Sequence, residues 1–314
     1  MTNHRHTHHV ESRMTRQPAV SAAINSCLHR AKTLLMLLLL LAAVPCQGRS
    51  FKIQYEKSDS LKVVSLLSDA RRQPAGTNFT IFFARRLKGI PYVGHTLEVN
   101  KTEQLVINLR QLDCTTYVEN VVALTMCMKQ KKYTFSDFCY NLRSLRYRGN
   151  SAPDYTKRLH YFTDWIEDNT GKGVCHEVQS PNPPFSAVQK INVYYMSANP
   201  DKYKIMREHP EYIPQIAASE KAINGKQYRF IPKTQAKDSP QLRAAVKDGD
   251  IIALTSAVGG LDIQHVGFAV WHSDGLHLLN ASSLRRKTVE EPMTIYNYLQ
   301  KQRKMTGFRV IRLL

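Results

Sequence analysis

Three residues of this chain carry the side chains that a cysteine hydrolase needs. Cys114 offers a thiol, His265 an imidazole that can take its proton, and Asn280 an amide that can orient the imidazole. They lie far apart in the sequence. Their chemistry therefore depends on the helices and strands that would bring them together.

Cys114 is expected in the first turn of a helix. From Cys114 to Met128 the apolar side chains recur at three- and four-residue spacing, and Asp113 is a suitable N-cap. A helix N-terminus lowers the pKa of a thiol and so favours the nucleophilic thiolate. The alternative is a structural cysteine buried on the apolar face of this helix, which is the commoner place for a free cysteine.

His265 begins an expected strand over 265–271. By the two-residue period of a strand, His265 shares one face with Gly267, Ala269 and Trp271. The small residues at 267 and 269 would let a helix approach the sheet closely beside the histidine. The alternative is a hydrogen-bonded surface histidine at the start of a strand.

Asn280 is placed by the register of an expected hairpin. If Asp274-Gly275 forms a two-residue loop, Ala269 pairs with Asn280, which then lies on the face of His265. An amide oxygen there could accept the imidazole N–H and fix its tautomer. A three-residue loop would move Asn280 to the opposite face. An asparagine at a strand end, entering a turn, is an equally good interpretation.

The remaining pattern predicts an α+β fold, in which the helix that carries the cysteine packs on an antiparallel sheet that carries the histidine. Further helices are expected over 59–72 and 134–147. Strands are expected over 96–99, 104–108, 228–231, 251–254, 266–271, 276–279 and 308–313.

Residues 1–48 are expected to be a signal segment, and residues 49–314 a single domain. Basic residues precede an apolar run over 34–44 that is too short to span a bilayer comfortably. Export to the periplasm or cell envelope is therefore predicted, with a single membrane anchor as the alternative. Cys46 could carry a lipid, but Pro45 departs from the small residue that a lipoprotein signal wants.

The charge and the cysteines exclude some partners. The chain carries a net charge of +19, and residues 1–48 hold five Lys/Arg and one acid, which leaves +15 for the remainder. The basic residues are scattered and no nucleic-acid motif is present, so an anionic envelope polymer or membrane face is the expected partner. Cys114, Cys127, Cys139 and Cys175 lack paired CxxC spacing, which argues against a zinc site. Export would permit one disulfide among the last three.

Five motifs occur in the order seen in NlpC/P60 cell-wall hydrolases, and the chain resembles that superfamily. The motifs are Gly89-Ile90-Pro91-Tyr92-Val93-Gly94, Asp113-Cys114-Thr115, Gly249-Asp250-Ile251-Ile252, His265-Val266-Gly267-Phe268 and Asn280-Ala281-Ser282. Three longer stretches, 91–98, 113–119 and 158–166, resemble the DUF1460 branch, which is similar to N-acetylmuramoyl-L-alanine amidases. The resemblance covers residues 60–314 and implies a papain-like core with an insertion at about 130–245.

The resemblance also implies roles for individual residues. Cys114 would be the nucleophile, His265 the base and Asn280 the group that orients it, although many relatives carry histidine at the third position. Tyr92 matches a tyrosine that positions the substrate or polarises its carbonyl. The inserted segment would form the cleft wall, with Tyr161, Asp164 and Trp165 as candidates for binding sugar; a core beneath a loop is the alternative. Glu98 and Glu119 could meet a ligand ammonium or pair with lysine and arginine.

The implied activity is cleavage of the amide between N-acetylmuramic acid and L-alanine in peptidoglycan fragments (muropeptides). The resemblance implies no metal and no organic cofactor. Two alternatives stay open: a γ-D-glutamyl endopeptidase that uses the same triad, and a wall-binding protein with an inactive site.

Overall fold

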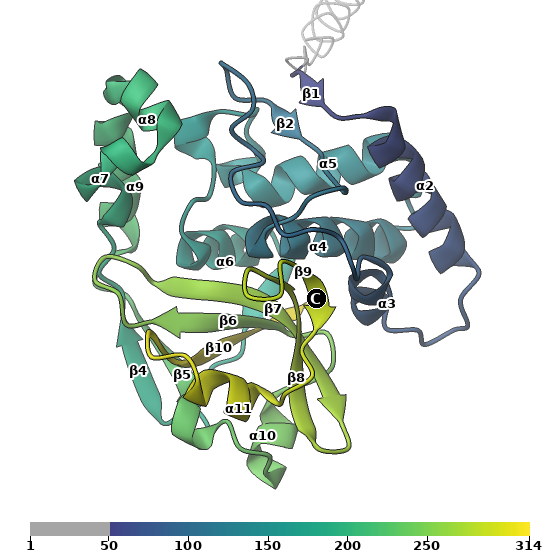
Figure 1. Cartoon of the computed structure of the whole chain (residues 1–314), viewed down its shortest axis with the longest axis vertical. Helices are drawn as coiled ribbons and strands as arrows, with labels where there is room; N and C mark the ends of the chain where they lie inside the picture. Colours follow the sequence, from purple (N-terminus) through teal and green to yellow (C-terminus); the bar gives the residue numbers. More distant parts are fainter. Residues whose placement is uncertain (1–50) are drawn as a thin grey trace, which may run out of the picture. The chain divides into compact units, whose positions relative to one another are not determined.

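The computed structural model describes residues 51–314, so the expected signal segment and Cys46 lie outside the described residues. The described part consists of a helical layer and an antiparallel sheet (Figure 1). This confirms the predicted α+β class with an antiparallel sheet. No helix within residues 51–314 combines the length and the apolarity needed to cross a bilayer.

The helices are α2 (Lys57–Arg71), α3 (Phe79–Arg86), α4 (Cys114–Gln130), α5 (Phe135–Arg146), α6 (Phe162–Gly171), α7 (Tyr195–Ala198), α8 (Lys204–Glu208), α9 (Ile213–Ile223), α10 (Pro240–Ala245) and α11 (Ile295–Gln300). The main strands are β3 (Cys175–Glu177), β4 (Ala187–Lys190), β5 (Gln227–Pro232), β6 (Ile251–Ser256), β7 (Ile263–His272), β8 (Gly275–Ser282), β9 (Lys287–Glu290) and β10 (Met305–Leu313). Two short strands, β1 (Ile53–Gln54) and β2 (Leu105–Val106), form a separate parallel pair.

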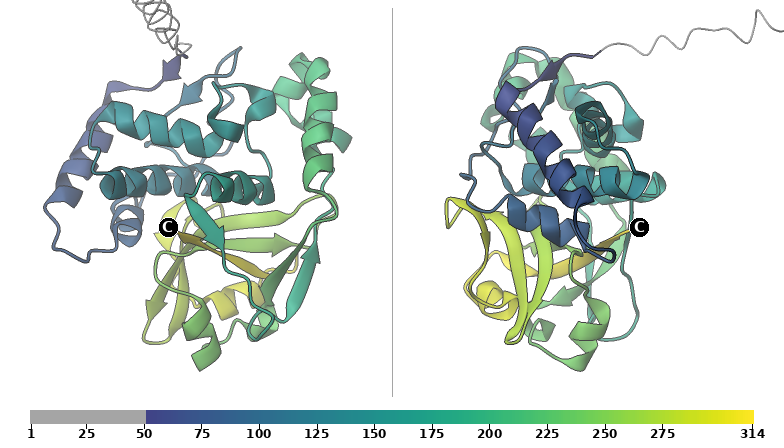
Figure 2. Two further views of the ribbon diagram at one scale, coloured as in Figure 1. Left: turned by 180° about the vertical axis from the view of Figure 1, so that it is seen from behind. Right: turned by 90° about the vertical axis from the view of Figure 1, so that its right-hand side faces the viewer.

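The large sheet has the strand order β4-β5-β10-β6-β7-β8-β9, and β3 pairs with β10. All of its pairs are antiparallel. Helices α2 to α6 lie on one side of this sheet, as the two views in Figure 2 show. Helices α10 and α11 lie on the other side, where Leu242, Ile295 and Leu299 pack against Ala269 and Leu278.

Helix α4 begins at Cys114, as predicted, because of a reciprocal cap. The side chain of Asp113 accepts from the Thr116 N–H at 2.8 Å, and Thr116 Oγ1 accepts from the Asp113 N–H at 2.9 Å. The helix then packs on β7, where Tyr117 and Phe268 meet edge to face with their centroids 5.8 Å apart. Local sequence thus fixes where the helix begins, and apolar burial fixes the face that it turns to the sheet.

The β7–β8 hairpin has a two-residue loop, but the loop is Ser273-Asp274 and the pairing is His272 with Gly275. The predicted pairing of Ala269 with Asn280 is therefore wrong by two residues, since Ala269 pairs with Leu278. A shift of two residues preserves the face, because side chains alternate with a period of two. Asn280 consequently still lies on the face of His265.

Gly267 makes room for a strand rather than for a helix. A Cβ built on Gly267 would lie 2.5 Å from the carbonyl oxygen of Leu279 and 2.9 Å from Asn280 Cβ, both on β8. A helix does lie on this face, since Ala269 packs with Ile295 and Leu299 of α11, but the space at Gly267 itself is taken by β8. The close contact instead brings β8 against β7 beside His265.

The strand predicted over 96–99 is a turn. His95 has a positive φ of 62°, and the Glu98 N–H donates to the His95 carbonyl at 3.2 Å. The segment from 130 to 245, expected as an insertion, contains α5 to α10. Within it α7, α8 and α9 share a small apolar core of their own, built on Ile205, Met206 and Ile216.

Candidate active site

Cys114 and His265 line the same cavity, although the first is on α4 and the second on β7. The cavity has a volume of about 240 Å³. Its other lining residues are Thr115, Leu159, His160, Tyr161, Phe162, Met196, Tyr203, Leu261, Asp262, Ile263, Gln264 and Val266. The Cys114 thiol is free and half-buried, and none of the other three cysteines within residues 51–314 forms a disulfide.

His265 is held by Asn280. The Nε2 of His265 lies 3.0 Å from the Oδ1 of Asn280, and both side chains are buried. An amide oxygen only accepts, so Nε2 carries the proton and Nδ1 keeps its lone pair. The Asn280 amide nitrogen donates to the Leu278 carbonyl, which fixes the orientation of the amide. The structure thus brings together the three residues proposed as catalytic, with Nδ1 as the basic atom.

The environment of the pair favours uncharged groups at rest. Burial, and next the charge of Asp113, raise the pKa of the Cys114 thiol to about 12, although the Val266 N–H and Thr115 partly offset this. Burial also lowers the pKa of His265, against opposing contributions from Asn280, Glu291 and Asp113. A neutral thiol beside a neutral imidazole can react if the proton moves to Nδ1 as the sulfur attacks.

Tyr92 is fixed close to the nucleophile by two strand-like contacts of its loop. The Tyr92 N–H donates to the Arg286 carbonyl at 2.9 Å, and the Val93 N–H donates to the Leu112 carbonyl at 3.1 Å. The loop is thereby tied both to the turn after β8 and to the residues just before Cys114. Burial, and next the proximity of Cys114 and Asp113, raise the pKa of the Tyr92 hydroxyl, so this group is a hydrogen-bond donor.

Tyr161 lines the cavity and connects it to α7 and α9 through hydrogen bonds. Its hydroxyl donates to Glu220 Oε1 on α9 at 2.7 Å and accepts from the Met196 N–H on α7 at 3.0 Å. Met196 and Tyr203 line the same cavity. The α7–α9 segment, drawn in green in Figure 1, therefore contributes Met196 of α7 and Tyr203 to one side of the cavity.

Of the predicted binding residues Tyr161 lines the cavity, whereas Tyr92, Asp164 and Trp165 are not among its lining residues. Trp165 is fully buried and stacks on Phe162, with centroids 4.9 Å apart. The carboxylate of Asp164 forms two hydrogen bonds with Arg148. These placements favour the core interpretation of both residues over direct contact with a sugar.

The two glutamates singled out in the sequence pair with arginines. Glu98 bonds to Arg158 at 3.2 Å, and Glu119 forms a buried pair with Arg146 at 2.7 Å. Neither carboxylate lines the cavity. Both placements match the expected alternative of pairing with basic residues.

Two side chains near the site, His160 and Tyr298, were missed by sequence reasoning. His160 lines the cavity, and its Nε2–H donates to the Tyr155 carbonyl at 2.8 Å; burial and the charge of Arg158 lower its pKa to about 3. Burial and the charges of Glu291 and Cys114 raise the pKa of Tyr298 to about 12. No local sequence signal marks these residues, because their proximity to Cys114 and His265 arises only from packing.

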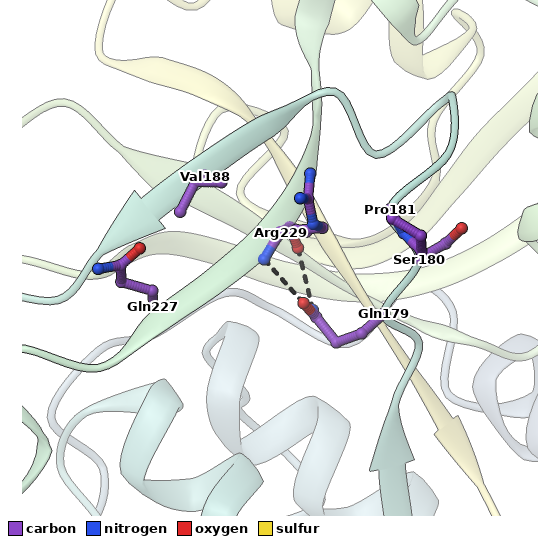
Figure 3. A pocket seen from close by; sticks show the side chains of 6 residues that line it. All are labelled: Gln179, Ser180, Pro181, Val188, Gln227 and Arg229. Atoms are coloured by element: carbon purple, nitrogen blue, oxygen red, sulfur yellow. Dashed lines mark hydrogen bonds between the residues drawn. The ribbon is translucent and has the colours of Figure 1, made fainter.

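A larger hollow lies over β4 and β5, away from this chemistry (Figure 3). It measures about 340 Å³ and is lined by Gln179, Ser180, Pro181, Val188, Gln227 and Arg229. The Gln179 side chain bonds to both backbone groups of Arg229, at 2.8 and 3.0 Å. No thiol, imidazole or carboxylate lines this hollow, so it has no general base to activate its one hydroxyl, that of Ser180.

A family model and solved structures both relate the chain to N-acetylmuramoyl-L-alanine amidases. Residues 82–307 match the family described as AmiA-like, N-acetylmuramoyl-L-alanine amidase-like. An N-acetylmuramoyl-L-alanine amidase structure from Bacteroides uniformis is 35% identical, with a TM-score of 0.69, over 75% of this chain and 97% of that one. The chain therefore belongs to the N-acetylmuramoyl-L-alanine amidase-like family.

Other solved structures are also similar. A proposed xylanase from Bacteroides fragilis is 37% identical, with a TM-score of 0.68, over 73% of this chain and 99% of that one. A DUF1460 protein from Legionella pneumophila is 20% identical, with a TM-score of 0.64, over 82% of this chain and 95% of that one, and supports the fold alone. These relatives are consistent with the DUF1460 branch predicted from the sequence. No curated protein matches the chain.

Proposed function

We propose that this protein is an exported, cysteine-dependent amidase that cleaves the N-acetylmuramoyl-L-alanine amide of peptidoglycan fragments. The observation that carries the proposal is the shared cavity of Cys114 and His265, with His265 held by Asn280 at 3.0 Å. The helix that bears the cysteine packs on antiparallel strands that bear the other two residues. This arrangement supports an NlpC/P60-like, papain-like core.

The geometry supports a two-step mechanism. Cys114 Sγ attacks the lactyl carbonyl carbon while its proton passes to His265 Nδ1. The Tyr92 hydroxyl and the Cys114 N–H, which has no intrahelical acceptor in the first turn, are donors for the oxyanion. His265 then protonates the leaving amine, which releases the peptide and leaves a thioester. Water, deprotonated by His265, hydrolyses the thioester and frees the muramic acid carboxylate.

The cavity does not support a glycosidase. Glycoside hydrolysis uses two carboxyl groups on either side of the scissile bond. Asp262 is the single carboxylate among the lining residues, and its Oδ2 accepts from the Thr163 N–H at 2.7 Å. The amidase proposal therefore stands in preference to the xylanase activity suggested for the Bacteroides fragilis relative.

Export is part of the proposal. It rests on the basic residues and the short apolar run that precede residue 48. Peptidoglycan lies outside the cytoplasmic membrane, so the location fits the substrate. Lipid attachment at Cys46 would be revealed by the mass of the N-terminal peptide from membrane and soluble fractions.

The experiment is mass spectrometry of defined muropeptides after incubation with the purified protein. Cys114→Ala removes the nucleophile, and Cys127→Ala is the matched control because Cys127 is a buried cysteine of the same helix. Release of the intact stem peptide by the wild type and Cys127→Ala, but not by Cys114→Ala, supports the proposal. A stem cut internally would instead identify the γ-D-glutamyl endopeptidase. Absence of any cleavage would contradict the proposal and favour a wall-binding protein or a substrate outside the cell wall.

A further inference from the structure

Three potential metal ligands gather at the turn of the β7–β8 hairpin. His272 ends β7, Asp274 lies in the two-residue loop, and His277 is on β8. One donor atom from each residue lies within 4.8 Å of the others. The two imidazole rings lie against each other, with their centroids 4.2 Å apart. Along β7 this cluster is roughly 23 Å from His265, so it does not belong to the catalytic cavity.

In each imidazole ring, one nitrogen already has a hydrogen-bond partner outside the cluster. His277 Nδ1 lies 2.8 Å from the Glu291 carbonyl oxygen, and His272 Nε2 lies 2.7 Å from Glu290 Oε1. Carbonyl and carboxylate oxygens accept, so these two nitrogens carry the protons. The lone pairs of the neutral rings are then on His272 Nδ1 and His277 Nε2. Metal-binding histidines typically donate their second N–H to a carboxylate or a backbone carbonyl in this way.

The contact between His277 and Asp274 places two acceptors together. His277 Nε2 lies 2.9 Å from Asp274 Oδ1, and His277 is buried whereas Asp274 is exposed. With the Nδ1 proton committed to a carbonyl, a neutral ring offers Asp274 only a lone pair. The contact therefore requires either a second proton on the ring or a cation between nitrogen and oxygen.

Glu290 acts as the orienting group rather than as a ligand. It also accepts from Arg85 at 2.9 Å and lies 3.6 Å from Lys88 Nζ, so its charge is shared with two basic residues. The Asp274 carboxylate has His277 as its partner and is otherwise open to solvent. The ligand set is thus two imidazole nitrogens and one carboxylate oxygen.

We propose that His272, Asp274 and His277 bind a divalent transition-metal ion, for which Zn²⁺ is the best match. Two imidazoles and a carboxylate suit zinc, whereas Mg²⁺ and Ca²⁺ prefer oxygen ligands alone. The fourth position is left to water. The ion would fasten the tip of the hairpin whose other end carries His265 and Asn280, and so would stabilise the fold without entering the reaction.

The test is zinc binding measured by competition with a chromogenic chelator. All samples carry Cys114→Ala, which removes the reactive thiol as a ligand. They also carry serine at the N-terminal histidines, which would bind metal themselves: His4, His6, His8 and His9. His209→Ala is the matched control, since His209 is a partly exposed histidine that also contacts a nearby carboxylate, Glu211, at 3.0 Å.

The expected result is one zinc ion per chain, bound equally by the background protein and by His209→Ala. His272→Ala and Asp274→Asn, both at exposed positions, should each weaken zinc binding. Replacing a residue that only orients a metal ligand typically lowers metal affinity roughly 10–100-fold, and loss of a ligand itself should lower it at least as much. Zinc should raise the melting temperature of the background protein but not of these two variants. Absence of saturable binding at micromolar zinc, or equal binding by all variants, would overturn the proposal and leave an imidazolium–carboxylate pair.

Discussion

The Nε2 of His265 lies 3.0 Å from the Oδ1 of Asn280, and the register of two neighbouring strands makes that contact. The hairpin pairs Phe268 with Leu279, so the residue beside Asn280 on β7 is Gly267, two positions from His265 on the same face. Both side chains are buried, and the Asn280 amide is fully so. The contact therefore fixes the ring with its Nδ1 lone pair free, as the proposed base requires.

Asn280→Ala should lower kcat because the imidazole loses both its orientation and its preferred tautomer. We expect a loss of roughly 10- to 100-fold, smaller than the 10²–10⁴ that a positioned acid–base group contributes. The measurement is kcat and KM on a muropeptide substrate over a range of pH. Asn141→Ala is the control, since Asn141 is equally buried but lies on α5, away from the cavity. An equal loss of kcat in both variants would contradict the orienting role.

Gly267→Ala should destabilise the hairpin and displace Asn280. The added Cβ would meet the Leu279 carbonyl oxygen at 2.5 Å, a distance that requires β7 and β8 to separate. We expect a loss of about 1–3 kcal/mol in the free energy of unfolding, as for other overpacked sites. Urea denaturation measures it, with Gly94→Ala as the control because no atom lies within 4 Å of a Cβ there. Unchanged stability and activity of Gly267→Ala would contradict this prediction and show that β7 and β8 accommodate the added methyl group without cost.

Alkylation of Cys114 in the free enzyme should accelerate with pH. Burial and the Asp113 charge raise the pKa of this thiol to about 12. The thiolate is the reactive species, so its fraction, and with it the rate, should rise about tenfold per pH unit without a plateau below pH 10. Iodoacetamide labelling between pH 6 and 10, followed by peptide mass spectrometry, measures the rate. A rate that stays flat from pH 6 to 8 would show instead a preformed thiolate–imidazolium pair.

Trp165 should matter for folding and not for direct substrate contact. Its side chain is fully buried behind Phe162, so Trp165→Ala should cost about 3–5 kcal/mol in the free energy of unfolding. Trp165→Phe keeps an aromatic core, and its KM should stay within about twofold of the wild type. Phe162→Ala, which changes the cavity wall, should raise KM. A raised KM in a fully stable Trp165→Phe protein would instead support direct contact between Trp165 and the sugar.

Local signals in the sequence predicted the elements around the site well. Asp113 and Thr116 form a cap through contacts three residues apart, so the start of α4 could be predicted from a short window. The face of Asn280 was predicted correctly although the loop was misplaced by one residue, because a two-residue loop at either position preserves the alternation. The strand expected over 96–99 failed because the positive φ of His95 turns the chain, and no residue type announced that turn.

The sequence by itself determined which residues can perform nucleophilic chemistry and which elements carry them, since capping, helical period and strand alternation act over a few residues. Only the tertiary structure decided which of these side chains share a cavity. Cys114 and His265 come together through the packing of α4 on β7, Trp165 of α6 is fully buried, and Tyr161 is held at the cavity by Glu220 and Met196. The hydrophobic effect favours burial of any aromatic side chain and does not depend on which residues surround it. Only the folded arrangement of α4, α6 and the sheet therefore shows which aromatics belong to the core and which to the site.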